Sequence, residues 1–480
     1  MADREEAPAP QPRTSLKPRK RFVGSKTATP SKPGVSGVIG HQIPQDILQD
    51  GQLNAAIAQL PPNYSFEIHK TVHQIRKNGA SMVALQMPEG LQMFACTIAD
   101  IIERFTDALT VIMGDVTYGA CCVDDYTAVA LGCDMLLNEG TIVPMDQTSI
   151  KTLYVFVEIA IDSAHLAETV RLNFPSDRQQ FHENLLNSEE TDRLIPAGTK
   201  IGSTSHLRIE GPSSDDDEGR GPSLSHEPTR LALVSTIQFV AALQRLKEDL
   251  TSVAGSSGKL WSGKYEATIP RSKPLSPGEI LGCTAPRLND VDALIYLGDG
   301  RFHLESIMIA NPSVPAFRYD PYSKKLTRER YDHREMQSVR DDAVQTARRS
   351  ITASPSGVWG VILGTLGRQG SFKQLQAITN QLQACKTPIP YVQILLSEVS
   401  PAKLALFNPY ISTFIQTSCP RLSIDWGYAF DRPLLSPYET AVAVGQTASW
   451  MTEERTPGTY PMDFYTGGSA WAVSRSMGAF

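Results

Sequence analysis

Three stretches of the chain share one pattern: about five consecutive apolar residues, a short turn, and then apolar residues that recur with helical spacing. They are SMVALQMPEGLQMFACTIADIIERF (81–105), RLALVSTIQFVAALQRLKEDL (230–250) and GVWGVILGTLGRQGSFKQLQAITNQL (357–382). Unbroken apolar runs of this length are typical of strands buried on both faces, and the periodic segments indicate amphipathic helices. The pattern predicts an α/β protein of three related domains, each with a parallel sheet flanked by helices.

Shifts in composition divide the rest of the chain. Residues 1–40 are rich in Pro, Ser, Lys and Arg and predict a disordered basic tail. A polar stretch at about 176–229, which contains the run SSDDDEG, predicts an acidic insertion. Residues 451–480 show no periodicity and are assigned only as a C-terminal tail. The three α/β domains are then expected at 41–150, 151–345 and 346–450.

The overall composition is that of a globular intracellular protein. A net charge of -6, with 41% hydrophobic and 20% charged residues, gives no general attraction to nucleic acid or anionic lipid. No apolar run approaches the roughly 20 residues that cross a bilayer, and the first residues, MADREEAPAP, lack the apolar stretch of a secretory signal. We therefore expect a cytoplasmic protein without membrane contact or direct nucleic acid binding.

The seven cysteines are too few and too scattered for a disulfide framework. Three of them end strand-like runs that follow the three repeats: LTVIMGDVTYGAC at Cys121, GEILGC at Cys283 and STFIQTSC at Cys419. The order of elements leading to each cysteine is expected to be the same. Because ligands of parallel sheets bind beyond the carboxyl ends of the strands, three domains facing one another would arrange these thiols around a central site.

Three thiolates cannot close a tetrahedral zinc site, but they can hold three irons of a [4Fe-4S] cluster and leave the fourth open to a small ligand. The alternative is that each cysteine is a small buried residue, and from the residues alone both interpretations stay open. Cys96, Cys133 and Cys385 fit the packing interpretation better. Cys122 neighbours Cys121 and could replace it as a ligand.

Two further segments hold candidate binding residues. The strand-to-helix turn LGTLGRQGS offers backbone N–H groups and a guanidinium that could hold a carboxylate, although a tight turn explains its glycines equally well. Arg301 and His303 follow the strand-like run ALIYL, and His303 suits a structural hydrogen bond as well as a site role. Asp425 is expected either to orient an element beside Cys419 or to cap a turn. In the glycine-rich turn LGTLGRQGS, the candidate binding residues are Gly364, Gly367, Arg368 and Gly370.

The motifs GDVTYGACCVDDYTA, LGCTAPRL, LGDGRFHLES, LGTLGRQGS, and TSCPRLSIDWG with PLLSPYE together resemble the diphthamide biosynthesis protein 1 family, the first subunits of 2-(3-amino-3-carboxypropyl)histidine synthase. The resemblance covers about residues 45–445 in a consistent order. It implies that Cys121, Cys283 and Cys419 each bind one iron of a [4Fe-4S] cluster, and that Cys122 packs. The chain lacks the CxxxCxxC loop of conventional radical S-adenosylmethionine enzymes.

The resemblance also implies an activity: transfer of a 3-amino-3-carboxypropyl group from S-adenosylmethionine to a histidine of translation elongation factor 2, by a noncanonical radical mechanism. This is the first step of diphthamide biosynthesis. The implied partners are a homologous second subunit in a heterodimer, translation elongation factor 2 as the protein substrate, and an iron-containing electron donor protein. The glycine-rich turn, Arg301 and His303 are candidates for binding the cosubstrate.

Two other functions stay open. An open iron could act as a Lewis acid in a dehydratase or condensing enzyme that resembles quinolinate synthase, and the chain could be a non-catalytic assembly subunit. One segment also departs from the family pattern, because residues 137–144 read LNEGTIVP where the family has a Tyr-Gly-His-Ser-Cys-like element. Either this loop is dispensable or the pocket is altered.

Overall fold

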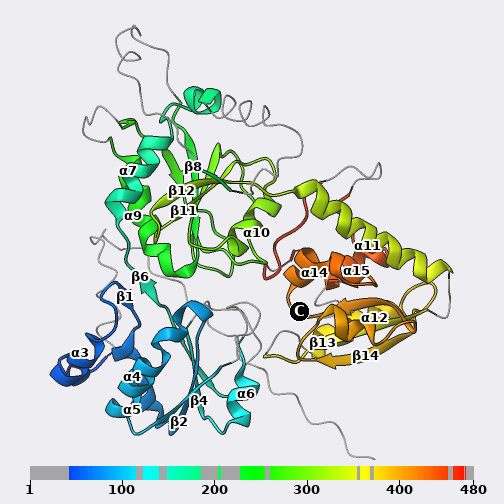
Figure 1. The fold of residues 1–480 in the computed structure, drawn as a ribbon, viewed down its shortest axis with the longest axis horizontal. Coiled ribbons are helices and arrows are strands. Elements are labelled where there is room, and N and C mark those ends of the chain that lie inside the picture. Colours follow the sequence, from blue (N-terminus) through cyan, green and yellow to red (C-terminus); the bar gives the residue numbers. More distant parts are fainter. Residues whose placement is uncertain are drawn as a thin grey trace, which may run out of the picture. The chain divides into compact units, whose positions relative to one another are not determined.

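Three larger β-sheets, each with helices beside it, account for most of the regular structure (Figure 1). The computed structural model describes residues 43–114, 123–139, 149–184, 204–206, 227–253, 260–353, 357–367, 372–451, 458–466, 468–469 and 471. Within these ranges, no helix is both long enough and apolar enough to span a membrane. A small antiparallel pair joins β1 (Tyr64–Ser65) to β6 (Glu158–Ile159).

The first sheet has four parallel strands, and its central strand is covered on both faces. In spatial order the strands are β3 (Leu109–Ile112), β2 (Met82–Gln86), β4 (Met135–Glu139) and β5 (Lys151–Val155). Val83, Ala84 and Leu85 of β2 are fully buried, as expected when both faces of a strand are packed. The preceding and intervening helices are α2 (Gln45–Leu48), α3 (Gly51–Ile57), α4 (Ile68–Asn78), η1 (Glu89–Phe94), α5 (Ala95–Phe105) and α6 (Asp125–Ala130).

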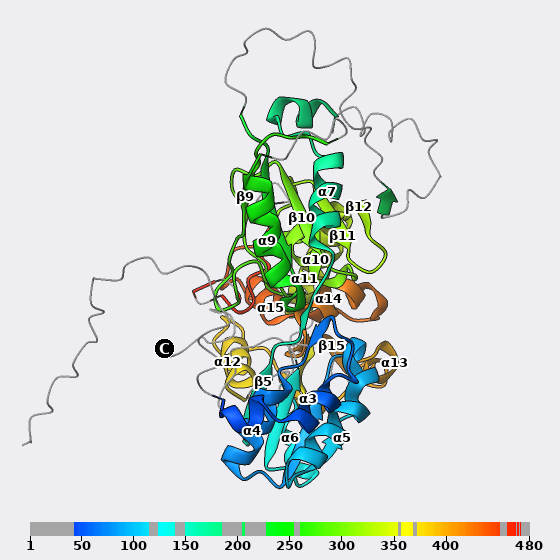
Figure 2. The ribbon, with the colours of Figure 1, turned by 90° about the vertical axis from the view of Figure 1, so that its left-hand side faces the viewer.

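The second sheet combines a parallel part with two antiparallel strands. Its order is β7 (Thr204–His206), β12 (Lys325–Glu329), β11 (Ala316–Asp320), β10 (Ala293–Leu297), β8 (Arg230–Ser235) and β9 (Glu266–Thr268). The strands from β11 to β9 are parallel, whereas β12 and β7 run antiparallel to their neighbours. Its helical elements are α7 (Ser163–Asn173), η2 (Ile237–Phe239), α9 (Val240–Thr251) and α10 (Phe302–Ala310). Helices α7 and α9 lie side by side (Figure 2), and buried Arg171 of α7 donates to the Asp249 carbonyl of α9 at 2.7 Å.

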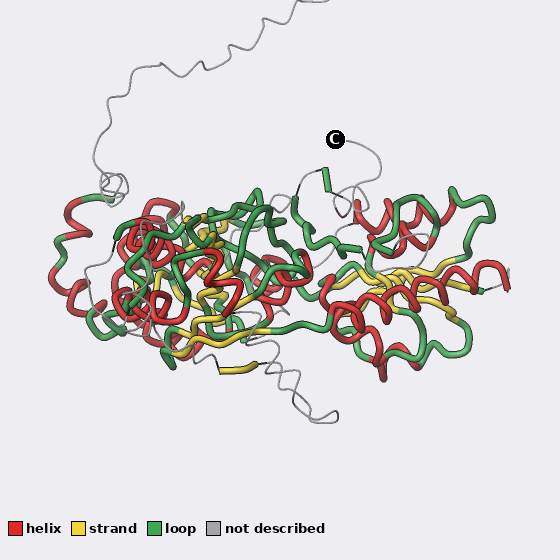
Figure 3. The backbone as a smooth tube through the Cα atoms, turned by 90° about the horizontal axis from the view of Figure 1, so that it is seen from above, coloured by secondary structure: helices red, strands yellow, loops and turns green. Residues whose placement is uncertain are grey.

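The third sheet is again parallel, and helices lie on both of its faces (Figure 3). Its order is β14 (Tyr391–Leu396), β13 (Val358–Gly364), β15 (Ile411–Gln416) and β16 (Leu434–Leu435). The helices around it are α11 (His333–Ala353), α12 (Phe372–Gln383), α13 (Pro401–Ala405), α14 (Pro420–Trp426), η3 (Gly427–Ala429) and α15 (Pro437–Ala443).

One strand order runs through all three sheets. When the strands of each parallel part are counted along the chain, the spatial order is second, first, third, fourth. The first strand of each unit is the apolar run that the sequence singles out: β2, β8 or β13. The predicted α/β fold with three related units is therefore confirmed. The second and third strands flank the first, so the loops after either strand begin at the same carboxyl edge of the sheet.

The described cysteines do not occupy equivalent places in this order. Cys283 comes between the second strand of its sheet, β9, and the third, β10, whereas Cys419 follows the third strand, β15. The expectation of one common order of elements is therefore wrong. The reason is that β14 and α13 lie between the third repeat and the strand that leads to Cys419. Cys121 lies outside the described residues.

The GEILGC run is not a regular strand. Glu279 forms an isolated parallel bridge with Ser235 at the end of β8, and Leu281 pairs with Thr284 across a tight turn. The Ser235 N–H donates to the Gly278 carbonyl at 2.8 Å, and the Ile280 N–H donates back to the Ser235 carbonyl at 3.1 Å. This segment therefore extends the second-strand position of its sheet and delivers Cys283 to the carboxyl end of β8.

Three segments belong to a different part of the fold than the expected domain limits indicate. Strand β5 begins at Lys151 and pairs with β4, so the first sheet extends past residue 150. Helix α11 begins at His333, and its Val344 and Ala347 are fully buried in a core shared with the third sheet, so it precedes the expected start at 346. Part of the expected insertion is also packed, because Phe181 is only 2% exposed.

A buried ion pair fastens α11 to the third sheet. Nε of Arg340 lies 2.7 Å from Oε1 of Glu439 in α15, and neither side chain is exposed. The Ser436 N–H and the Tyr460 hydroxyl also donate to Glu439, at 2.8 and 3.0 Å. A buried pair of this kind tolerates poorly the loss of one partner, since the other charge is left without compensation.

The C-terminal segment, to which the sequence assigns no structure, is packed into the protein. Tyr460 and Trp471 are 0% and 1% exposed, and they share one core with β8, β10, β13 and β15. The indole N–H of Trp471 donates to the Pro461 carbonyl at 2.8 Å. Backbone bonds also join this segment to the cysteine loop, since the Ala285 N–H donates to the Met462 carbonyl at 2.8 Å. Residues 458–471 therefore help to join the second and third sheets.

This packing can be tested with two tryptophan substitutions. Trp471→Ala should lower the free energy of unfolding by about 3–5 kcal/mol, because it empties a buried site. Trp426→Ala, at a residue that is 50% exposed, is the matched control and should cost about 1 kcal/mol. Urea unfolding followed by tryptophan fluorescence and circular dichroism measures both. Equal losses for the two variants would contradict a structural role for the C-terminal segment.

Candidate functional site

The loop that carries Cys283 is tight and buried, and it contacts the C-terminal segment and Phe302 of α10. Cys283 is 4% exposed, and its sulfur lies 3.7 Å from the Thr284 hydroxyl. From the C-terminal segment, the Phe464 N–H donates to the Cys283 carbonyl at 3.2 Å. The preceding residue must be small, because a Cβ atom on Gly282 would lie 2.2 Å from the Phe302 ring. The loop thus depends on a glycine at this one position.

The Cys419 loop joins β15 to α14. Cys419 is the N-cap residue of α14 and is 7% exposed, and Pro420 occupies the first helical turn, where a missing N–H is harmless. The amide of Gln416, at the end of β15, donates to the Cys419 carbonyl at 2.9 Å and to the Ser423 hydroxyl at 3.0 Å. These bonds fix the path of the backbone around Cys419.

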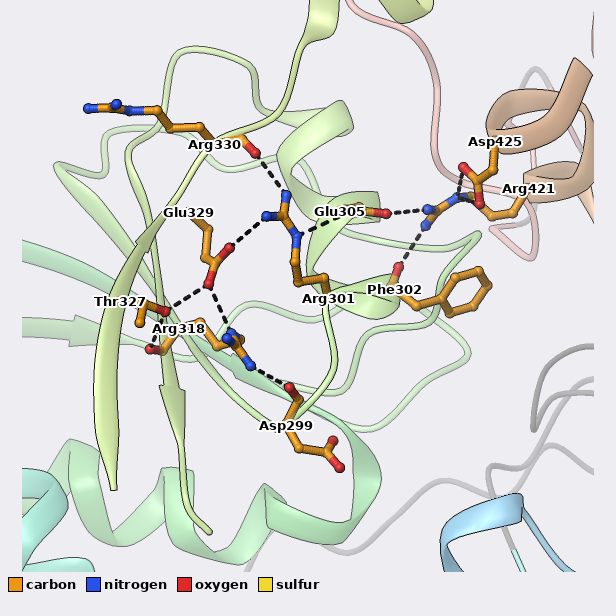
Figure 4. Close-up of polar contacts among 10 residues, drawn as sticks. All are labelled: Asp299, Arg301, Phe302, Glu305, Arg318, Thr327, Glu329, Arg330, Arg421 and Asp425. Atoms are coloured by element: carbon orange, nitrogen blue, oxygen red, sulfur yellow. Dashed lines mark hydrogen bonds and ion pairs between the residues drawn. The ribbon is translucent and has the colours of Figure 1, made fainter. Parts of the chain in front are cut away.

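Arg421 bonds Phe302, Glu305 and Asp425 (Figure 4), and it also connects the two cysteine loops. It lies two residues after Cys419, and its Nη1 donates to the Phe302 carbonyl at 2.6 Å and to the Gly282 carbonyl at 3.3 Å. Gly282 directly precedes Cys283. The guanidinium also lies over the Phe302 ring, 4.5 Å from its centroid. One side chain of the third domain therefore reaches the backbone beside the other cysteine.

Two carboxylates hold this guanidinium. Nε of Arg421 donates to Asp425 at 2.8 and 3.0 Å, and Nη2 donates to Glu305 at 2.5 Å. Burial lowers the pKa of Arg421, but the charges of Asp425 and Glu305 outweigh this effect and raise its pKa overall, so the side chain stays charged. Of the two expected roles for Asp425, the structure supports orienting the element beside Cys419.

Arg301, a candidate from the sequence, lies in the same chain of charges (Figure 4). Its guanidinium is 3.1 Å from Glu329 and 3.5 Å from Glu305, and it donates to the Arg330 carbonyl at 2.9 Å. Buried Glu329 also accepts from Arg318 at 2.9 Å. We call this series the arginine–carboxylate network; its members are Asp425, Arg421, Glu305, Arg301, Glu329 and Arg318. A cosubstrate role for Arg301 stays a prediction.

His303 lies on the first turn of α10 and is half-buried. Burial lowers the pKa of its imidazole to about 4, and the positive charge of Arg421 acts in the same direction. His303 is therefore neutral at pH 7 and can both donate and accept a hydrogen bond. Whether it contacts a cosubstrate stays a prediction.

The glycine-rich turn begins beside the Cys419 loop. Gly364 ends β13, and its N–H donates to the Thr417 hydroxyl at 3.4 Å. Thr417 precedes Cys419 by two residues. Gly367 has a φ of 59°, a left-handed conformation that favours glycine, so the turn alone explains this residue. Arg368 and Gly370 lie outside the described residues. The described part thus neither supports nor contradicts carboxylate binding here.

The structure adds site residues that the sequence reading does not single out. Arg421 bonds the backbone beside Cys283, Glu305 pairs with Arg421, and Glu329 pairs with Arg301; these contacts join residues far apart in the chain. The one local signal is the i,i+4 spacing of Arg421 and Asp425. Among the described residues, no group of three or more His, Cys, Asp or Glu side chains could hold a metal ion. Of residues 137–144, the segment that departs from the family pattern, residues 140–144 lie outside the described ranges.

Comparison with solved structures identifies the fold. The chain resembles Dph2 from Pyrococcus horikoshii, solved with a 4Fe-4S cluster, with a TM-score of 0.54 and 20% sequence identity over 83% of this chain and 96% of that chain. A second crystal structure of the same Dph2 gives a TM-score of 0.53. At this level of identity the likeness concerns the three-sheet α/β architecture.

Sequence comparison identifies the family. The family described as "Putative diphthamide synthesis protein" matches residues 87–185 and 222–455. The chain is 48% identical to 2-(3-amino-3-carboxypropyl)histidine synthase subunit 1 of Homo sapiens over 445 residues, 91% of this chain and 84% of that protein. The Schizosaccharomyces pombe protein of the same name is 44% identical over 93% of this chain and 92% of its own length. The chain belongs to the diphthamide synthesis protein family.

The low pKa of His303 predicts an acid-sensitive fold. Between pH 6.5 and about 4 the unfolded state binds a proton at this residue while the folded state does not, so stability should fall as the pH drops through this window. NMR titration of labelled histidines, with His303→Gln to identify the signal, should give a pKa of about 4 for His303. The same variant should lose less melting temperature than the wild type between pH 7 and pH 5. A His303 pKa at or above 6.5 would show that its imidazole is not desolvated in the folded protein.

Proposed function

We propose that this chain is the catalytic iron–sulfur subunit of 2-(3-amino-3-carboxypropyl)histidine synthase. It would transfer a 3-amino-3-carboxypropyl group from S-adenosylmethionine to a histidine of translation elongation factor 2, the first step of diphthamide biosynthesis. The observation that carries the proposal is the 48% identity, over most of the chain, to proteins named as subunit 1 of that synthase.

The described thiols fit a cluster site. Cys283 and Cys419 are both nearly buried, both belong to loops at carboxyl ends of sheet strands, and Arg421 bonds the backbone next to Cys283. With Cys121 they would hold a [4Fe-4S] cluster by three thiolates and leave one iron for a small ligand. When bound, the cluster would supply the electron for reductive cleavage of the Cγ–S bond of S-adenosylmethionine, a noncanonical radical reaction that yields methylthioadenosine.

The chain itself would position the cosubstrate and exclude water. The Gly364 end of β13 bonds Thr417 beside the Cys419 loop, so a cosubstrate held at the glycine-rich turn would lie near the proposed cluster. Neutral His303 offers a hydrogen bond without adding charge near a sulfonium. Arg301 is engaged by two carboxylates, so it would act on the cosubstrate mainly by holding neighbouring groups in place. The proposed set is Gly364, Gly367, Arg368, Gly370, Arg301 and His303.

The proposal includes three protein partners. The relatives are named as subunit 1, which supports a heterodimer with a homologous second subunit. Translation elongation factor 2 would be the substrate, and an iron-containing protein would deliver electrons. The expected location is the cytoplasm.

The activity is tested in two reactions, the first without the protein substrate and the second with it. Purified, oxygen-free protein with dithionite should convert S-adenosylmethionine to methylthioadenosine, and adding the second subunit and elongation factor 2 should give a modified histidine. Product analysis by mass spectrometry follows both reactions. Intact S-adenosylmethionine in the presence of a loaded cluster would point to a Lewis-acid enzyme instead. Equimolar zinc without sulfide would point to an assembly subunit.

Alanine substitution should separate ligand cysteines from packing cysteines. Cys121→Ala, Cys283→Ala and Cys419→Ala should each lower iron and sulfide content about tenfold or more, since each removes a thiolate ligand. Cys133→Ala and Cys385→Ala are matched controls, because both residues fit the packing interpretation and burial raises the pKa of both thiols. Cys122→Ala shows which of the two adjacent cysteines is the ligand, because iron and sulfide content should fall only for the ligand. Wild-type iron content in all three ligand variants would contradict the proposed site.

A further inference from the structure

We propose that Arg421 is a positioning residue that fixes the spacing between the Cys283 and Cys419 loops. The inference rests on the proposed function for the role of these cysteines as cluster ligands. It concerns how the second and third domains present two thiols to one group, and it assigns this task to a side chain that does not itself bind iron.

The contacts of Arg421 span the distance from one loop to the other. Its backbone belongs to the first turn of α14, which Cys419 caps. Its Nη1 reaches the carbonyl oxygens of Phe302 at 2.6 Å and of Gly282 at 3.3 Å. A guanidinium is planar and rigid, so hydrogen bonds donated in its plane fix the relative position of the groups that accept them. The bond to Gly282 thus relates the Cys283 backbone to the start of α14.

The guanidinium is itself fixed on its other sides. Asp425 accepts from Nε one helical turn along α14, and Glu305 accepts from Nη2 across the domain boundary. The Phe302 ring covers one face, and the Arg421 side chain is only 1% exposed. A lysine could retain the positive charge but could not make these bonds at once, because its ammonium lacks the planar fork.

The remaining network extends this support into the second sheet. Glu305 also pairs with Arg301, and Arg301 pairs with buried Glu329 at the end of β12. Glu329 in turn accepts from Arg318 of β11. The start of α14 is therefore tied through alternating charges to two strands of the second sheet. Supporting bonds of this kind set the geometry of ligands that they do not touch.

The first test uses protein without iron, so it does not depend on cluster binding. Hydrogen exchange should be compared for wild type, Arg421→Lys, Arg421→Met and the control Arg340→Gln. Arg340 is an equally buried arginine of the third domain, but it bonds Glu439 and the Leu434 carbonyl instead. Exchange in peptides covering 279–287 should rise about tenfold in both Arg421 variants, since a charge-assisted bond to the loop is lost. The Arg340→Gln control breaks the pair with Glu439 and should raise exchange mainly in α11 and α15, and less in 279–287 than either Arg421 variant does.

The second test uses protein reconstituted with iron and sulfide under nitrogen. Loss of iron to a chelator should be about tenfold or more faster in Arg421→Lys than in wild type, as for other supporting partners of metal ligands. The electron paramagnetic resonance spectrum of the reduced cluster should also change, which mere loss of stability does not produce. Wild-type exchange and wild-type iron loss in Arg421→Lys would overturn the inference. If wild type binds no cluster, the proposed function fails, and the exchange experiment alone then decides the role of Arg421.

Discussion

The pairing of the buried Arg421 guanidinium of α14 with Glu305 of α10 is the interaction on which the candidate site depends. Removing a guanidinium from water is costly unless its N–H groups find acceptors. Arg421 donates to two carboxylates and two carbonyl oxygens, and its face lies over an aromatic ring. Those partners come from both the second and the third domain. The relative arrangement of the two domains that satisfies this charge also places the backbone beside Cys283 near the start of the Cys419 helix.

The repeated strand order explains why such a contact is possible. In each sheet the first strand lies between the second and the third, and its middle residues are apolar and buried. Its carboxyl end is therefore flanked by the loops after the second and third strands. Cys283 uses the loop after a second strand and Cys419 uses the loop after a third. The shared strand order thus supplies two different positions at the carboxyl ends of two sheets. The C-terminal segment bonds the Cys283 loop through the Phe464 N–H.

Local patterns predicted the fold well, whereas the site depends on contacts that no local pattern contains. The apolar runs around Val83, Leu233 and Val361 are buried strands, as their composition indicates. The Arg421–Glu305 pair joins residues 116 positions apart, so no window of sequence reveals it. Trp471 was likewise not predicted to be buried, because an irregular segment packs through single side chains without periodicity.

The central claim is that thiols from separate domains share one iron–sulfur group. Crystals grown without oxygen and measured at the iron absorption edge would locate the metal directly. We expect one compact iron density contacted by the sulfurs of Cys283, Cys419 and Cys121, with a fourth iron free of protein thiolate. Iron bound at a different place, or a density that touches only one of these sulfurs, would contradict the shared site.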